Sequence, residues 1–76
     1  MTEWSEFTLN GWTFKAYMPT QDHEVQQWFV HVIDPNKDEH LFYVPMDYAP
    51  VFGPDVSDIE ALNEAVESFI KERRIE

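Results

Sequence analysis

Histidine and carboxylate side chains are the groups in this chain that could do metal or acid–base chemistry. Two of the three histidines stand in acidic clusters, Asp22-His23-Glu24 and Asp38-Glu39-His40. A metal ion needs several ligands that converge within about 2–2.6 Å of one point. Neither cluster has the spacing of a ligand set, such as two histidines four residues apart on a helix. His31 and His40 are expected on one sheet face, but only as diagonal neighbours on opposite strands. We therefore expect no metal site.

The sequence offers little for nucleophilic catalysis or phosphate binding. It has no cysteine, which excludes a thiolate nucleophile, a disulfide and a Cys-ligated zinc site. No serine is flanked by glycines, and the two glycines, Gly11 and Gly53, cannot form a phosphate-binding loop. A chain of 76 residues has a small core and rarely forms a cleft that holds two carboxylates at a catalytic separation. We expect no enzyme activity and no cofactor.

Composition restricts the class of protein and its partners. The net charge of −10 opposes contact with a phosphate backbone, so direct binding of nucleic acid is not expected. A hydrophobic content of 43% and an aromatic content of 16% are too high for a disordered acidic tail. The longest strictly apolar run, residues 41–44, is too short to cross a membrane. The opening residues 1–6 lack the basic-then-apolar order of a signal peptide. We expect one globular domain over residues 1–76, located in the cytoplasm.

An Asn-Gly pair predicts a hairpin near the start of the chain. Asn10-Gly11 suits a type I′ turn, in which both central residues have positive φ. Strands over about 4–9 and 12–18 then alternate, with apolar residues on one face and polar residues on the other. This turn pairs Leu9 with Trp12, Thr8 with Thr13, Phe7 with Phe14, and Glu6 with Lys15.

A second hairpin is expected from two runs rich in β-branched and aromatic residues, at about 25–33 and 40–45. The residues between them, 34–39, form a dense turn cluster. We predict a register with Ile33 opposite His40. In that register one face carries Phe29, His31, Ile33, His40, Phe42 and Val44. The opposite face carries Trp28, Val30, Val32, Leu41 and Tyr43.

The last third of the chain predicts an amphipathic helix over about 58–74. Ser57 and Glu60 have the spacing of a capping box, with Ser57 as the N-cap, and Val56 and Ala61 have that of a hydrophobic staple. No glycine follows the helix, so its C-terminal end is expected to fray. Six apolar residues share one face of the helix: Ile59, Leu62, Ala65, Val66, Phe69 and Ile70.

These elements predict an α+β fold, a small antiparallel meander in the order β-β-β-β-α. The connections between strands are short enough to favour sequential antiparallel neighbours. The C-terminal amphipathic helix is expected to pack on one sheet face, and the long connection over 46–56 to wrap a sheet edge. Four aromatic residues are expected in the core: Trp12, Phe14, Phe29 and Phe42.

A sheet with one helix leaves one face open, and that face is the first candidate for function. The predicted register places an apolar patch on it, and aromatic residues are enriched in the cores of protein interfaces. We expect a non-enzymatic interaction module that binds a partner protein or a second copy of itself. On this hypothesis Trp28→Glu weakens association and leaves the fold intact. The patch consists of Trp28, Val30, Val32, Leu41 and Tyr43.

The acidity supports an alternative function. An ordered acidic domain can imitate the spaced phosphates of a nucleic acid and occupy a basic groove of a nucleic-acid-handling protein. Such binding would weaken steeply with salt, whereas an apolar contact would not. The acidic residues are scattered along the chain, so this hypothesis ranks second. Its candidates are Asp58, Glu60, Glu64 and Glu67 on the helix, and Asp34, Asp38 and Glu39 in the turn.

Overall fold

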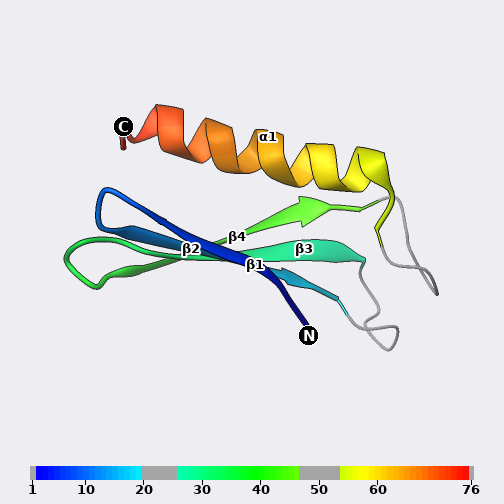
Figure 1. Ribbon diagram of the computed structural model, residues 1–76, viewed down its shortest axis with the longest axis horizontal. Coiled ribbons are helices and arrows are strands. Elements are labelled where there is room, and N and C mark those ends of the chain that lie inside the picture. Colours follow the sequence, from blue (N-terminus) through cyan, green and yellow to red (C-terminus); the bar gives the residue numbers. More distant parts are fainter. Residues whose placement is uncertain (1, 20–25, 47–53, 76) are drawn as a thin grey trace.

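Four strands form one antiparallel sheet in sequence order, and one helix covers one of its faces (Figure 1). The computed structural model describes residues 2–19, 26–46 and 54–75. The predicted path of the connection before the helix falls mostly on residues 47–53, outside this part of the chain. The predicted α+β meander is confirmed. Its elements are β1 (Thr2–Leu9), β2 (Trp12–Met18), β3 (Gln27–Ile33), β4 (Glu39–Pro45) and α1 (Val56–Glu72).

The first hairpin has the predicted register, with Leu9 opposite Trp12 across the Asn-Gly turn. Asn10 and Gly11 both have positive φ, 49° and 85°, as a type I′ turn requires. A Cβ on Gly11 would also lie 3.3 Å from Cγ of Pro35, in the turn of the second hairpin. The Asn-Gly pair therefore sets the register and lets the two turns approach each other.

The second hairpin is offset by one residue from the prediction, because Ile33 pairs with Glu39 and not with His40. The turn is shorter than expected, since Asp34 and Asp38 already bond through their backbones (Asp34 N to Asp38 O, 2.9 Å). Lys37 makes this possible by adopting a left-handed conformation, with φ of 71°. A slip of one residue exchanges the faces of a strand. His31 and His40 therefore lie on opposite faces of the sheet.

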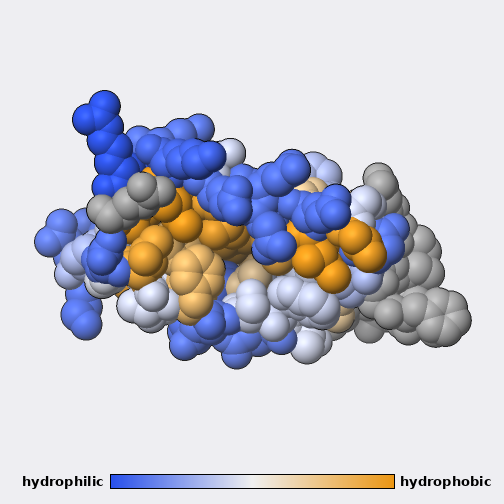
Figure 2. Space-filling model, turned by 45° about the horizontal axis from the view of Figure 1, so that its top comes forward, coloured by the Kyte–Doolittle hydropathy of each residue, from blue (hydrophilic) through white to orange (hydrophobic). Residues whose placement is uncertain are grey.

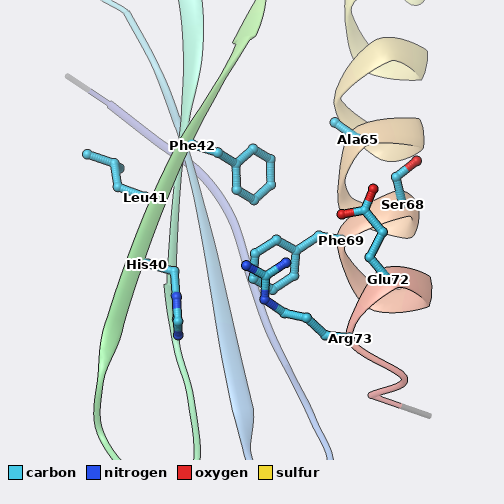
Figure 3. Close-up of a pocket in the computed structure, with 8 residues that line it drawn as sticks. All are labelled: His40, Leu41, Phe42, Ala65, Ser68, Phe69, Glu72 and Arg73. Atoms are coloured by element: carbon cyan, nitrogen blue, oxygen red, sulfur yellow. The ribbon is translucent and has the colours of Figure 1, made fainter.

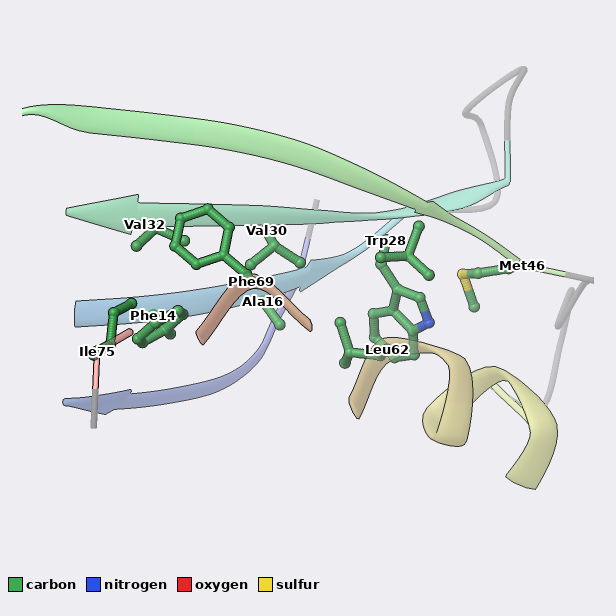
Figure 4. Packing of buried hydrophobic residues seen from close by; sticks show 10 residues of the cluster. Phe14, Ala16, Trp28, Val30, Val32, Met46, Leu62, Phe69 and Ile75 are labelled. Carbon is green, nitrogen blue, oxygen red and sulfur yellow. The ribbon is translucent and has the colours of Figure 1, made fainter. Parts of the chain in front are cut away.

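The core lies between the sheet and α1 (Figure 4). The apolar stripe of the helix is confirmed, because Leu62 and Phe69 are buried and its other members pack against the core. Trp28 is completely buried, and its indole Nε1 donates a hydrogen bond to the backbone oxygen of Asp58 (3.0 Å). The buried hydrophobic residues are Phe14, Ala16, Trp28, Val30, Val32, Val44, Met46, Leu62, Phe69 and Ile75.

The helix begins earlier than predicted, with Asp55 as the N-cap in place of Ser57. Asp55 Oδ1 accepts from the backbone N–H of Asp58 (2.9 Å), and Asp58 Oδ2 accepts from the N–H of Asp55 (3.3 Å). The Ser57 hydroxyl donates to the same Asp55 oxygen (2.7 Å). An ionised carboxylate is a stronger acceptor than a hydroxyl, which explains why the aspartate forms the cap. Val56 is 70% exposed, so the predicted staple does not form.

The C-terminal end of the helix is closed and not frayed. Arg74 has a φ of 53°, the left-handed conformation usually supplied by glycine. Its N–H donates to Lys71 O (3.2 Å), and the N–H of Ile75 donates to Ile70 O (3.1 Å), which is the Schellman pattern. Ile75 is buried, and its carbonyl accepts from Asn10 Nδ2 (2.6 Å). Burial of Ile75 offsets the strain at Arg74.

Candidate interaction surface

The sheet face opposite α1 carries an apolar cluster, which we call the open-face cluster. Strand pairing places Tyr17, Phe29 and Tyr43 in one row across β2, β3 and β4. The rings of Phe29 and Tyr43 meet edge to face, with centroids 5.0 Å apart. Leu41 is 57% exposed and Tyr43 is 49% exposed. The cluster consists of Tyr17, Phe29, Ile33, Leu41 and Tyr43, and His31 lies on the same face.

The structure divides the predicted patch between the two faces of the sheet. Leu41 and Tyr43 lie on the open face, as predicted, whereas three of the predicted residues are buried under α1: Trp28, Val30 and Val32. Phe29, predicted in the core, belongs to the open face. The one-residue register error is the cause, because it joined the exposed positions of β4 to the buried positions of β3.

Sequence reasoning missed Phe29, His31 and Ile33 as members of the open face. One signal could have found the correct side of β3. Its side chains alternate between two sets. One set, Trp28, Val30 and Val32, has neither a side-chain amide nor an ionisable group. The other set has both, in Gln27 and His31, and also contains Phe29 and Ile33. The set with neither an amide nor an ionisable group is the better candidate for the core.

Polar pairs border the open-face cluster. Lys15 Nζ lies 3.8 Å from Glu6 Oε1, and His31 Nε2 lies 2.9 Å from Glu39 Oε1. Lys15 is directly opposite His31 in the sheet. The two polar pairs are therefore neighbours, next to the row formed by Tyr17, Phe29 and Tyr43. An apolar centre with a polar rim is the arrangement found in protein interfaces.

A hollow of about 490 Å³ lies between β4 and α1, and we call it the α1–β4 hollow (Figure 3). The rings of Phe42 and Phe69 face each other there, with centroids 5.3 Å apart. The Arg73 guanidinium lies 3.9 Å from the centroid of the Phe69 ring. The lining residues are His40, Leu41, Phe42, Ala65, Ser68, Phe69, Glu72 and Arg73.

A carboxylate in the β3–β4 turn organises the residues at one end of the hollow. Asp34 Oδ2 lies 3.1 Å from His40 Nε2, and Asp34 Oδ1 accepts from the backbone N–H groups of Asn36 and Asp38, each at 2.9 Å. These bonds hold the pKa of Asp34 below its ordinary value, and the bond to His40 is the largest cause. Asp34 therefore acts in the turn and is not a free surface charge.

The acidic residues proposed as a mimic of nucleic acid do not all face solvent. Asp58 is buried in the capping box, and Asp34 is engaged in its turn. Glu60, Glu64 and Glu67 are exposed on α1. Figure 2 shows hydrophilic residues over much of the helix side of the molecule, with hydrophobic areas between them.

Within the described residues, no three His, Asp or Glu side chains are grouped so that they could hold a metal ion. The Asp22-His23-Glu24 cluster lies outside those residues. No helix in the same part of the chain is long and apolar enough to cross a membrane. Comparison with protein-family models, with curated proteins and with solved structures finds no match to this chain.

Proposed function

We propose that this chain is a non-enzymatic, cytoplasmic interaction module that binds another protein through the open face of its sheet. The exposure of Leu41 and Tyr43, next to the ring of Phe29, carries the proposal. Contiguous exposed apolar residues with a polar rim mark interaction sites on small proteins. The polar pairs at the rim, Glu6–Lys15 and His31–Glu39, orient the partner and add little to the affinity.

The test is affinity capture from native lysate, with the immobilised protein and its variants, at low and high salt. Tyr43→Lys should lose the captured protein, because it places a charge at the centre of the cluster. Val56→Glu is the matched control, since it also replaces an exposed apolar residue but lies at the start of α1, away from the open face. Capture should persist at high salt with at most a modest loss, because apolar contacts are not screened and only charge contacts at the rim are weakened. Equal capture by wild type and Tyr43→Lys would contradict the proposal.

The alternative is an acidic mimic that occupies a basic groove of a nucleic-acid-handling protein. Glu60, Glu64 and Glu67 support it, because they are exposed at spacings that bring helix side chains within about 5–6 Å of each other. In this case the captured protein should be released by rising salt and by added DNA. Glu64→Lys should weaken capture, and Tyr43→Lys should not.

A further inference from the structure

Strand β4 is an edge of the sheet, and its hydrogen-bond pattern shows which backbone groups face outward. Two bonds at the ends of the β3–β4 hairpin, Met46 N to Gln26 O (3.2 Å) and Asp34 N to Asp38 O (2.9 Å), fix the alternation of bonded pairs. His40, Phe42 and Val44 are opposite bonded partners on β3. The N–H and C=O groups of the residues between them therefore point away from the sheet. These outward residues are Glu39, Leu41 and Tyr43.

Both ends of this outward edge are closed. Pro45 occupies the next outward position and has no N–H to leave unpaired, and proline is typical of exposed edges. The other end runs into the turn closed by Asp34 and Asp38. Among residues 2–19, 26–46 and 54–75, no backbone group pairs with the outer edge of β4. This free edge is a short regular segment, residues 39–43, that can pair with an extended strand.

The opposite edge of the sheet is less suited to such pairing. β1 has an irregular register between Glu3 and Ser5, and bulges and charges obstruct the addition of a strand. In a two-residue hairpin the residues that flank the turn, here Leu9 and Trp12, form a hydrogen-bonded pair. By alternation, the backbone N–H and C=O groups of Glu6 and Thr8 point outward from β1. Both residues have polar side chains. A hollow of about 260 Å³ does lie beside Phe7 under α1, but the outward residues next to it, Glu6 and Thr8, offer no apolar side chain to an added strand.

The α1–β4 hollow runs beside the free edge of β4. In Figure 3, Leu41 points away from α1, whereas Phe42 points toward Phe69. A strand added to β4 would likewise alternate, with one set of side chains in the hollow and the other beside Leu41 and Tyr43. A second copy would not fill the hollow with its own β4, because the helix-facing side chains of that strand, His40 and Phe42, already pack near its own α1.

Charge indicates the chemistry of the segment. A net charge of −10 favours a basic partner, and Glu39 is exposed at the free edge. A lysine or arginine stem can cover Leu41 while its charge lies over the Tyr43 ring or beside Glu39. We propose that β4 takes up an extended segment of a partner protein as a fifth strand. Its apolar side chains fill the α1–β4 hollow, and its basic side chains lie on the open face. This inference rests on the proposed function and specifies how the partner binds.

The test uses an acetylated, amidated eight-residue peptide that alternates valine and lysine, titrated into the full chain. A peptide with four valines followed by four lysines is the composition control. Leu41→Pro should weaken binding by at least about tenfold, since it removes an outward N–H and obstructs the edge. Leu41→Ala separates this effect from loss of the side chain. Thr8→Pro, the corresponding change on β1, should alter the affinity by less than about twofold. Thermal melting of each variant confirms that it folds.

Hydrogen exchange provides a second measurement on the unchanged protein. The peptide should protect the amides of Leu41 and Tyr43 and leave those of Glu6 and Thr8 unprotected. No binding at millimolar peptide, equal binding of both peptides, or equal binding by Leu41→Pro would each overturn the inference. A wild-type dimer that Leu41→Pro dissociates would also overturn it, because a second copy would then occupy the edge. If lysate capture depends on Tyr43 but survives Leu41→Pro, the edge inference fails and the proposed function stands.

Discussion

Two aspartates each complete a local structure by accepting hydrogen bonds from backbone N–H groups. Asp34 does so in the β3–β4 turn, and Asp55 does so at the start of α1. In both cases the pKa of the carboxyl lies below its ordinary value, because the bonds favour the ionised form. The acidity of the chain therefore includes charges that the fold itself uses.

Replacement of Asp55 tests the position of the helix cap. Asp55→Ala should lower the melting temperature by about 4–8 °C, because the Asp58 amide and the Ser57 hydroxyl both lose their acceptor. Ser57→Ala should have a smaller effect, since the cap remains. Thermal denaturation followed by circular dichroism measures both. If the serine variant is the less stable of the two, the helix starts at Ser57 after all.

Acid titration tests the role of Asp34. The pKa of Asp34 in the folded protein is below its ordinary value of 3.8, so the unfolded chain binds the proton more readily. The stability that this group contributes is present above that value and is lost as the pH falls through the folded pKa. Asp34→Asn should therefore flatten the fall in urea midpoint between about pH 5 and pH 2. Glu60→Gln, on the exposed side of α1, is the control and should retain the wild-type slope.

At the scale of elements, the turn of the β3–β4 hairpin and the C-terminal end of α1 each depend on a residue in an unusual backbone conformation. Lys37 and Arg74 have left-handed backbones without being glycine. Each is held by bonds of its own turn, Lys37 N to Asp34 O (2.9 Å) and Arg74 N to Lys71 O (3.2 Å). Such conformations are uncommon for residues with a Cβ and store local strain.

Arg74→Gly should stabilise the protein by about 0.5–1 kcal/mol. Glycine adopts the left-handed conformation without the penalty of a Cβ, and its greater freedom in the unfolded chain offsets only part of the gain. Glu72→Gly, within the last turn of α1, is the matched control and should destabilise by about 0.5–1 kcal/mol. Urea unfolding of both variants measures the difference. A destabilised Arg74→Gly would show that residue 74 is not left-handed in solution.

At the scale of the whole molecule, two side-chain hydrogen bonds connect elements that are far apart in the sequence. Trp28 on β3 bonds to the backbone of Asp58 in the first turn of α1, and Asn10 in the first turn of the sheet bonds to Ile75 after the helix. They connect the sheet to both ends of α1. The helix is thus positioned along its length, which keeps the α1–β4 hollow beside the edge of β4.

Trp28→Phe should destabilise the protein by about 2–3 kcal/mol. The change removes the donor to the Asp58 carbonyl and leaves part of a buried site empty. Trp4→Phe is the control, because Trp4 is 43% exposed and its ring meets Trp28 edge to face, a contact that phenylalanine can keep. Its effect should remain below about 1 kcal/mol. Equal losses for the two variants would mean that Trp28 is not buried. Trp28→Glu, expected from the sequence to leave the fold intact, should instead unfold the chain.

The features that the sequence determined by itself are those encoded by neighbours along the chain. Asn10 and Gly11 supply positive φ at adjacent positions, so the turn and the register of β1 with β2 follow from two residues. The apolar stripe of α1 follows from helical periodicity, and the order of elements follows from short connections. Each of these features needs information from only a few consecutive residues.

Only the tertiary structure decided the register of β3 with β4 and hence the membership of the open face. Both faces of this hairpin are largely apolar, so alternation alone permits either assignment. The choice depends on a left-handed lysine in the turn and on the fit of Trp28 beneath the first turn of α1, where the indole finds an acceptor. Such a partner lies 30 residues away in the chain. The burial free energy of a large side chain therefore settles a register that local pattern leaves open.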